Sequence, residues 1–147
     1  MLRVVRADPD CVFCQVIAGR AGATKVVDDE ETVAFLDTSP VFKGHVLVVP
    51  REHHETLLDV PGDLLGPLFT TVQRIQRAVM AAVGAKGTFV AMNNVVSQSV
   101  PHLHVHVVPR TKGDGLRGFF WPRVKYADAA EYEDYAARIR SELRPAG

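Results

Sequence analysis

Three of the six histidines in this chain alternate with apolar residues in one short segment, residues 102–108, which read His-Leu-His-Val-His-Val-Val. The β-branched residues predict a strand that ends at Pro109. Side chains two residues apart on a strand lie on the same face, about 6.5–7 Å from each other. We therefore expect the three imidazoles on one face, where their near-neutral pKa suits nucleophilic or acid–base chemistry.

The residues alone leave two functional interpretations of this face open. Alternating histidines on a strand can share a zinc ion through all three rings. The other interpretation is a histidine nucleophile flanked by helper residues. The segment from Asn93 to Ser99 favours it, because this polar loop offers amides, hydroxyls and backbone N–H groups that suit an anion such as phosphate.

The two cysteines of the chain, Cys11 and Cys14, form a Cys-x-x-Cys pair. In a cytosolic chain this spacing indicates a metal or redox pair rather than a stabilising disulfide. Two thiolates supply half of a tetrahedral zinc site. No thioredoxin-like βαβ pattern follows the pair, which disfavours redox chemistry, while a pair of small buried thiols is the structural alternative.

The elements that must position these groups follow from periodicity and from turn residues. We predict a helix over 11–18, a hairpin of strands 24–28 and 32–36, a buried strand over 45–49, a long helix over 63–83, strands over 88–92 and 102–108, and an amphipathic helix over 128–144. Clustered strands between helices are typical of an α+β fold with an antiparallel sheet.

Composition limits the classes of function. The chain has 147 residues, enough for one domain with a sizeable core, and its formal net charge is zero. This balance argues against nucleic acid or a membrane surface as partner, although basic residues gather over 110–125. We see no spanning apolar run and no signal peptide, so we expect a cytoplasmic protein.

Together these residues resemble the histidine-triad (HIT) family. Residues 102–108 match the family signature, His-φ-His-φ-His-φ-φ with φ apolar, at every position. The Cys-x-x-Cys pair resembles the opening of many bacterial members, and residues 34–40 and 44–53 resemble the first half of the family pattern. The resemblance spans residues 11–110 and implies a single HIT domain over 1–147, with a tail and helix over 111–147.

The resemblance implies nucleotidyl hydrolysis or transfer at an α-phosphate. The middle histidine, His104, would attack phosphorus and form a covalent nucleotidyl-histidine that water then resolves. A backbone carbonyl near His102 would orient that ring. His106 would contact phosphate oxygens, and His45 matches a histidine that lies near the leaving group in part of the family.

The resemblance also implies a nucleotide site. Asp37 matches the carboxylate that accepts both ribose hydroxyls, and the two residues before it resemble the apolar wall of the base pocket. Ser97 stands where glycine is common, the residue that most readily adopts positive φ. The implied nucleotide-binding residues are Phe35, Leu36, Asp37, Asn93, Gln98, Ser99, His104 and His106.

In zinc-bearing members, two histidines complete the metal site begun by the cysteine pair. The matching residues are Cys11, Cys14, His53 and His102, with His54 as a rival to His53. Such a zinc would be structural, and by holding His102 it would position the carbonyl that orients the nucleophile.

We therefore predict a HIT fold with a five-stranded antiparallel sheet, which dimerises into a continuous ten-stranded sheet. The expected substrate is a purine nucleotide or nucleotide conjugate related to AMP or GMP. One branch of the family cleaves phosphoramidates and acyl-adenylates, and another cleaves diadenosine polyphosphates. Two other classes stay open: a hydrolase that uses the three histidines as catalytic metal ligands, and a nucleotide-binding regulator with little turnover. The glycine-rich, aromatic and basic tail over 113–125 suits packing, a dimer contact or the distal part of the substrate.

Overall fold

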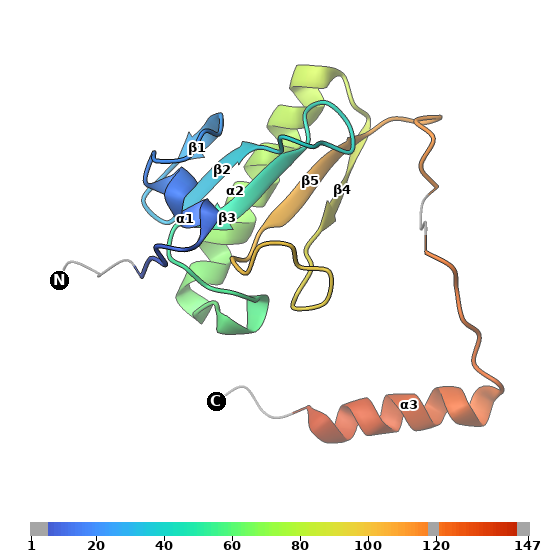
Figure 1. The fold of residues 1–147 in the computed structure, drawn as a ribbon. Coiled ribbons are helices and arrows are strands. Elements are labelled where there is room, and N and C mark those ends of the chain that lie inside the picture. Colours follow the sequence, from blue (N-terminus) through green and yellow to red (C-terminus); the bar gives the residue numbers. More distant parts are fainter. Residues whose placement is uncertain (1–5, 118–120, 144–147) are drawn as a thin grey trace. The chain divides into compact units, whose positions relative to one another are not determined.

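Five antiparallel strands form one sheet in the order β1-β2-β3-β5-β4 (Figure 1). The computed structural model describes residues 6–117 and 121–143. The architecture confirms the predicted α+β class and the predicted order of elements. The elements are α1 (Val12–Ile17), β1 (Lys25–Asp28), β2 (Thr32–Leu36), β3 (Val46–Pro50), the 3₁₀ helix η1 (Leu57–Asp59), α2 (Gly62–Val83), β4 (Gly87–Ala91), β5 (Val105–Arg110) and α3 (Ala129–Glu142).

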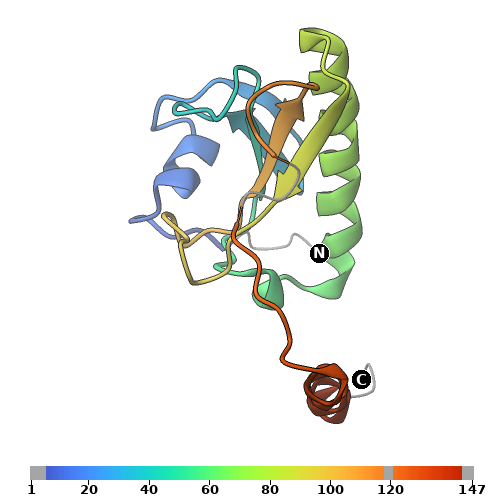
Figure 2. The same ribbon diagram turned by 90° about the vertical axis from the view of Figure 1, so that its right-hand side faces the viewer.

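The long helix α2 covers one face of the sheet, and the short helix α1 lies over the opposite face (Figure 2). The α2 face is an apolar core in which every third or fourth residue of the helix meets the strands. Its buried members include Val46, Val48, Leu64, Leu68, Val72, Ile75, Val79, Leu103, Val105 and Val107.

A second and smaller apolar cluster joins α1 to the other face of the same strands. Its buried members are Cys11, Phe13, Cys14, Val16, Val33, Phe35, Leu47 and Val49. All five residues of β3 are buried because the strand is covered on both faces. A strand in this position has a continuous apolar sequence rather than an alternating one.

The strand that carries the histidines begins at Val105, three residues later than predicted. Pro50 would face this part of the chain in the antiparallel register, but proline has no N–H for the ladder. Its carbonyl accepts a hydrogen bond from the side chain of His102 instead, at 2.8 Å. The N–H of Leu103 donates to the carbonyl of His54, at 2.7 Å. The first two triad histidines therefore lie in the connection before β5.

The alternation of faces holds in spite of this shift. Leu103, Val105 and Val107 are fully buried in the core under α2. The rings of His104 and His106 lie on the other face, with their centroids 5.0 Å apart. The period-two pattern thus predicts the direction of these side chains better than it predicts the start of the strand.

The other predicted boundaries agree with the observed ones to within two residues, and the strand over 32–36 matches at both ends. β5 continues through Pro109 to Arg110, because at this end it pairs with β4 alone and Pro109 stands opposite Thr88. The long helix ends as predicted at Gly84, whose φ of 70° lies in the left-handed region.

The chain divides into two compact units, residues 1–114 and 115–147. The second unit contains α3, whose N-cap Asp128 accepts a hydrogen bond from the N–H of Glu131 at 2.8 Å. The single domain over 1–147 stays a prediction. Residues 118–120 of the predicted functional tail lie outside the described residues.

Within the described ranges, no helix combines the length and the apolar character needed to cross a membrane. The cytoplasmic location stays a prediction.

Candidate active site and metal centre

A pocket of about 220 Å³ lies between α1 and the sheet, on the face that carries the imidazoles. Most of the residues that line it are apolar, and the polar ones supply a carboxylate, two hydroxyls and two imidazoles. The residues that line it are Val12, Phe13, Val16, Gly22, Ala23, Phe35, Leu36, Asp37, Thr38, Leu47, Ser99, His104 and His106. Six predicted site residues therefore share one cavity, although they come from three separate segments.

His104 presents a free lone pair to this pocket. Its Nδ1 lies 2.8 Å from the backbone carbonyl of His102, and because a carbonyl only accepts, Nδ1 must carry the proton. The neutral ring then has its lone pair on Nε2, which is the form of imidazole that attacks an electrophile. The carbonyl that the resemblance assigned to this task is the one that the structure provides.

His106 takes the opposite tautomer, and a chain of two hydrogen bonds sets it. The N–H of Val41 donates to Nδ1 of His45 at 3.1 Å, so a neutral His45 carries its proton on Nε2. That nitrogen lies 2.9 Å from Nδ1 of His106 and donates to it. The proton of His106 consequently resides on Nε2, which leaves an N–H donor for a ligand in the pocket.

The carboxylate of Asp37 belongs to the same polar group. Its Oδ2 lies 3.6 Å from Nε2 of His45, and its Oδ1 accepts a hydrogen bond from the N–H of Ser39 at 2.8 Å. Donor atoms of Asp37, His45 and His106 lie within 4.8 Å of one another, as a metal site would need. A metal on Nε2 of His45 would place the ring proton on Nδ1, against the Val41 N–H, so the local chemistry favours hydrogen bonding over ligation.

Burial keeps these two rings neutral. It lowers the pKa of His106 to about 4, and the neighbouring His104 and His45 lower it further. Burial also lowers the pKa of His45, against the opposing effect of Asp37. The tautomer chain therefore persists at neutral pH.

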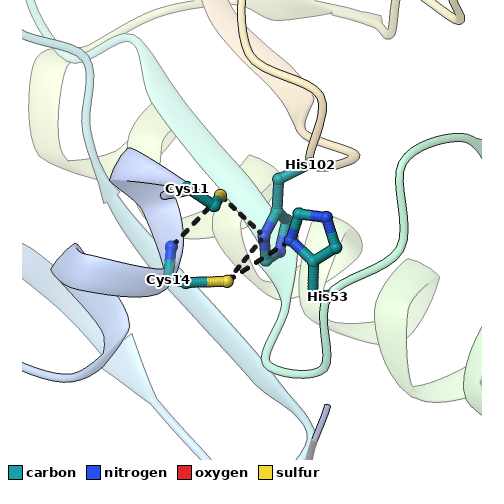
Figure 3. Close-up of side chains that lie close together, drawn as sticks. All are labelled: Cys11, Cys14, His53 and His102. Carbon is teal, nitrogen blue, oxygen red and sulfur yellow. Dashed lines mark hydrogen bonds between the residues drawn. The ribbon is translucent and has the colours of Figure 1, made fainter. Parts of the chain in front are cut away.

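A second cluster contains both thiols and two imidazoles, all of them buried (Figure 3). The Sγ of Cys14 lies 3.3 Å from Nδ1 of His53 and 3.6 Å from Nδ1 of His102, and the Sγ of Cys11 lies 3.5 Å from Nδ1 of His102. Zinc bonds of about 2.3 Å to sulfur and about 2.0–2.1 Å to nitrogen, at the tetrahedral angle, place such atoms about 3.5 Å apart. The four residues therefore fit a closed, structural zinc site.

The surroundings of His102 suit a metal ligand. Its Nε2–H donates to the carbonyl of Pro50 at 2.8 Å, which leaves the Nδ1 lone pair directed at the two sulfur atoms. Burial lowers the pKa of His102 to about 4, so the ring is neutral, and burial raises the pKa of the Cys14 thiol to about 11. Bound zinc would supply the positive charge that stabilises the thiolates.

The structure decides between residues that the sequence could not separate. His53 lies in the metal cluster, whereas His54 does not. Among the described residues, His102 groups with the cysteines, His106 groups with Asp37, and His104 belongs to neither cluster. The three triad histidines therefore do not converge on one ion, which removes the geometric basis for a three-histidine catalytic metal.

The loop before the triad holds itself in place with the side chains of predicted phosphate residues. Gln98 accepts from the N–H of Val95 at 2.9 Å and donates to the carbonyl of Glu55 at 2.5 Å. Asn93 donates to the carbonyl of Ser97 at 3.1 Å, and Ser97 has the positive φ of 61° that a glycine would readily adopt. Neither amide side chain lines the pocket, whereas Ser99 does. These contacts show how the loop is shaped, and the phosphate roles of Asn93 and Gln98 stay predictions.

Sequence reasoning did not identify one wall of the pocket. Val12, Phe13 and Val16 of α1 line the cavity, and they lie among the cysteines of the metal cluster along the chain. The signal was present in the helical spacing of these apolar residues around the Cys-x-x-Cys pair. The Cys-x-x-Cys pattern by itself indicates only the metal site in this segment.

Comparison with known proteins agrees with this geometry. The HIT domain family model matches residues 18–113. The protein Hit of Bacillus subtilis is 40% identical over 128 residues, which cover 85% of this chain and 86% of that protein. The chain belongs to the HIT family. Its five-stranded antiparallel sheet, with α2 on one face, is the HIT fold that the sequence predicted.

Two further members of the family resemble this HIT protein. The crystal structure of a zinc-bound histidine triad family protein from Mycobacterium smegmatis is 32% identical, with a TM-score of 0.70, and the match covers 91% of this chain and 98% of that one. The adenosine 5′-monophosphoramidase of Candida albicans is 28% identical over 140 residues, which cover 91% of this chain and 89% of that protein.

Proposed function

We propose that this HIT protein is a nucleotidyl hydrolase or transferase that cleaves nucleotide conjugates at the α-phosphate. One observation carries the proposal: two histidines in one pocket present opposite tautomers. His104 offers a lone pair on Nε2, and His106 offers an N–H on Nε2. Attack on phosphorus needs a nucleophile and, beside it, a donor for the charge on the phosphoryl oxygens.

The reaction proceeds in two displacements. Nε2 of His104 forms a bond to the α-phosphorus while the bond from phosphorus to the leaving group breaks, and the leaving group takes a proton from solvent as it departs. Water then attacks the same phosphorus, the N–P bond breaks, and the nucleoside monophosphate and a proton are released. His106 donates to a non-bridging oxygen in both steps, and Ser99 is placed in the same pocket for a second donor.

The apolar residues of the pocket suit a purine base, and Asp37, which lines the same pocket, would accept the ribose hydroxyls. Similarity to an adenosine 5′-monophosphoramidase supports AMP bound to an amine as the first substrate class to test. The resemblance extends this class to acyl-adenylates, with diadenosine polyphosphates as the alternative branch.

Zinc takes a structural part in this proposal. Cys11, Cys14, His53 and His102 would hold it, and the similarity to a zinc-bound family member supports that assignment.

We also propose the homodimer that is typical of the family, formed through α2 and the exposed edge of β4. Sedimentation at several protein concentrations tests it, and a monomer at every concentration contradicts it.

The proposed activity is tested by AMP release from adenosine 5′-phosphoramidate and from a diadenosine polyphosphate, for the wild type and for His104→Ala. We expect a fall of about 10³-fold or more in the variant, because the covalent route is lost. Rapid quenching and mass spectrometry of the intact wild type should detect the nucleotidyl adduct. Full activity in His104→Ala would contradict the nucleophile, and AMP binding with no turnover of any conjugate would favour the regulator instead.

A further inference from the structure

The six-residue helix α1 contributes to two sites at once. Cys14 and the N-cap Cys11 direct their sulfur atoms to the metal cluster. Val12, Phe13 and Val16 direct their side chains into the nucleotide pocket. An isolated helix of this length is not stable in water, so its position depends on what it packs against and binds.

Phe13, which lies between the two cysteines, contacts rings of both sites. Its centroid lies 5.2 Å from that of Phe35 in the pocket wall and 5.1 Å from that of His104, in edge-on geometry. It also lies 6.1 Å from the ring of His102, a member of the metal cluster. Movement of α1 would therefore change the pocket wall and the surroundings of the nucleophile together.

Without a metal, only weak polar contacts connect the cysteines of α1 to the two histidines. The S–N distances of 3.3–3.6 Å are those of weak hydrogen bonds. Metal–thiolate bonds are covalent and much stronger. Without metal bonds α1 is held by its apolar packing alone, and any ordering of α1 that nucleotide entry then requires lowers the affinity. A metal that fixes α1 in advance removes this cost.

We propose that metal occupancy and nucleotide binding are thermodynamically linked through α1, so that zinc raises the affinity of the pocket for the nucleotide. The inference rests on the proposed function, because it assumes that the pocket binds a nucleotide. It differs from the effect of zinc on the carbonyl of His102, which orients His104 and acts on the rate of attack. The α1 route acts on binding in the ground state.

The direct test measures AMP binding by calorimetry to the zinc-loaded protein and to the metal-free protein. Allosteric coupling in proteins is typically 5- to 150-fold, and we expect AMP affinity to fall by about fivefold or more when zinc is removed. Circular dichroism establishes whether the metal-free protein is folded under the same conditions.

Linkage is reciprocal, which provides a second measurement on the zinc-loaded protein alone. AMP should raise zinc affinity by the same factor by which zinc raises AMP affinity. Competition with a chromogenic chelator, with and without saturating AMP, measures this factor. Where the metal-free protein unfolds, AMP raises the apparent zinc affinity through folding as well, so the matched pocket variants isolate the contribution of α1.

Two pocket variants separate α1 from the rest of the wall. Phe13→Ala removes the wall residue that lies between the cysteines, whereas Leu36→Ala removes a wall residue from β2. Both should weaken AMP binding. The ratio of AMP affinity with zinc to AMP affinity without zinc should approach one in Phe13→Ala. In Leu36→Ala this ratio should keep its wild-type value.

The outcomes distinguish this inference from the proposed function. Equal AMP affinity with and without zinc would overturn the linkage through α1. The same conclusion would follow if Leu36→Ala and Phe13→Ala reduced the ratio of the two affinities alike. A protein that binds no zinc would overturn it as well. A zinc-loaded protein that binds neither AMP nor GMP would overturn the proposed function itself.

Discussion

The metal cluster and the polar group around His45 contain similar donor atoms at similar spacing, yet their chemistry differs. Both place imidazole nitrogens and further donors within 4.8 Å of one another. His102 has a backbone acceptor, the carbonyl of Pro50, on its second nitrogen, whereas His45 has a backbone donor, the N–H of Val41. The first partner directs a lone pair into the cluster, and the second directs a proton into it. One backbone group therefore decides whether a buried histidine binds a metal or donates a hydrogen bond.

The largest expected effect comes from breaking the metal cluster. Cys14→Ser should abolish stoichiometric zinc, which elemental analysis measures, and should lower the free energy of unfolding by about 3–4 kcal/mol relative to the zinc-loaded protein. Denaturant unfolding with and without a chelator measures this loss. His45→Gln is the matched control from the other cluster and should keep one zinc per chain. Loss of zinc in His45→Gln would mean that the two clusters do not differ as we describe.

An intermediate effect is expected from breaking the tautomer chain. His45→Leu removes the donor to His106 and should lower kcat by about tenfold, the value of one buried hydrogen bond of about 1–1.5 kcal/mol. His45→Gln carries an amide N–H at about the reach of the lost ring nitrogen and should recover part of the activity. Steady-state kinetics on both variants measures the difference. Equal activity in the leucine and glutamine variants would contradict the assigned role of the hydrogen bond.

The third expected effect is on stability at acidic pH. The pKa of His106 falls from 6.5 to about 4 on folding, so between these values the unfolded chain binds more protons than the folded one. Stability should therefore decrease as the pH is lowered from about 6.5 to 4. Thermal unfolding at a series of pH values measures the slope, with His106→Asn as the control that should make it shallower. A slope that the variant leaves unchanged would assign the acid sensitivity to other groups.

Much of this molecule was predictable because its signals are local. The period-two pattern around Val105 and the apolar spacing along α2 each depend on near neighbours in sequence, and both predictions were confirmed. The predicted start of β5 was wrong. The observed start depends on Pro50, which lies far away in the sequence and cannot donate a hydrogen bond to the ladder.

The candidate site was predictable in composition and less so in arrangement. The resemblance implied the four metal-cluster residues, which the fold brings together, but only the fold distinguishes His53 from the adjacent His54. The tautomers of His45 and His106 depend on the backbone N–H of Val41, which no side-chain pattern records. The pocket wall on α1 was overlooked because its residues share a short segment with two more conspicuous cysteines.

The metal cluster joins residues that are far apart along the chain, since Cys11 and His102 are separated by 91 positions. Closing so long a loop has an entropic cost that grows with its length, and contacts of this kind slow folding. During synthesis, the four ligands cannot meet until residue 102 has been made and β3 has brought its end close to α1. Zinc capture would therefore come late in folding, after these distant segments have met, and the ion would stabilise the assembled site rather than nucleate the fold.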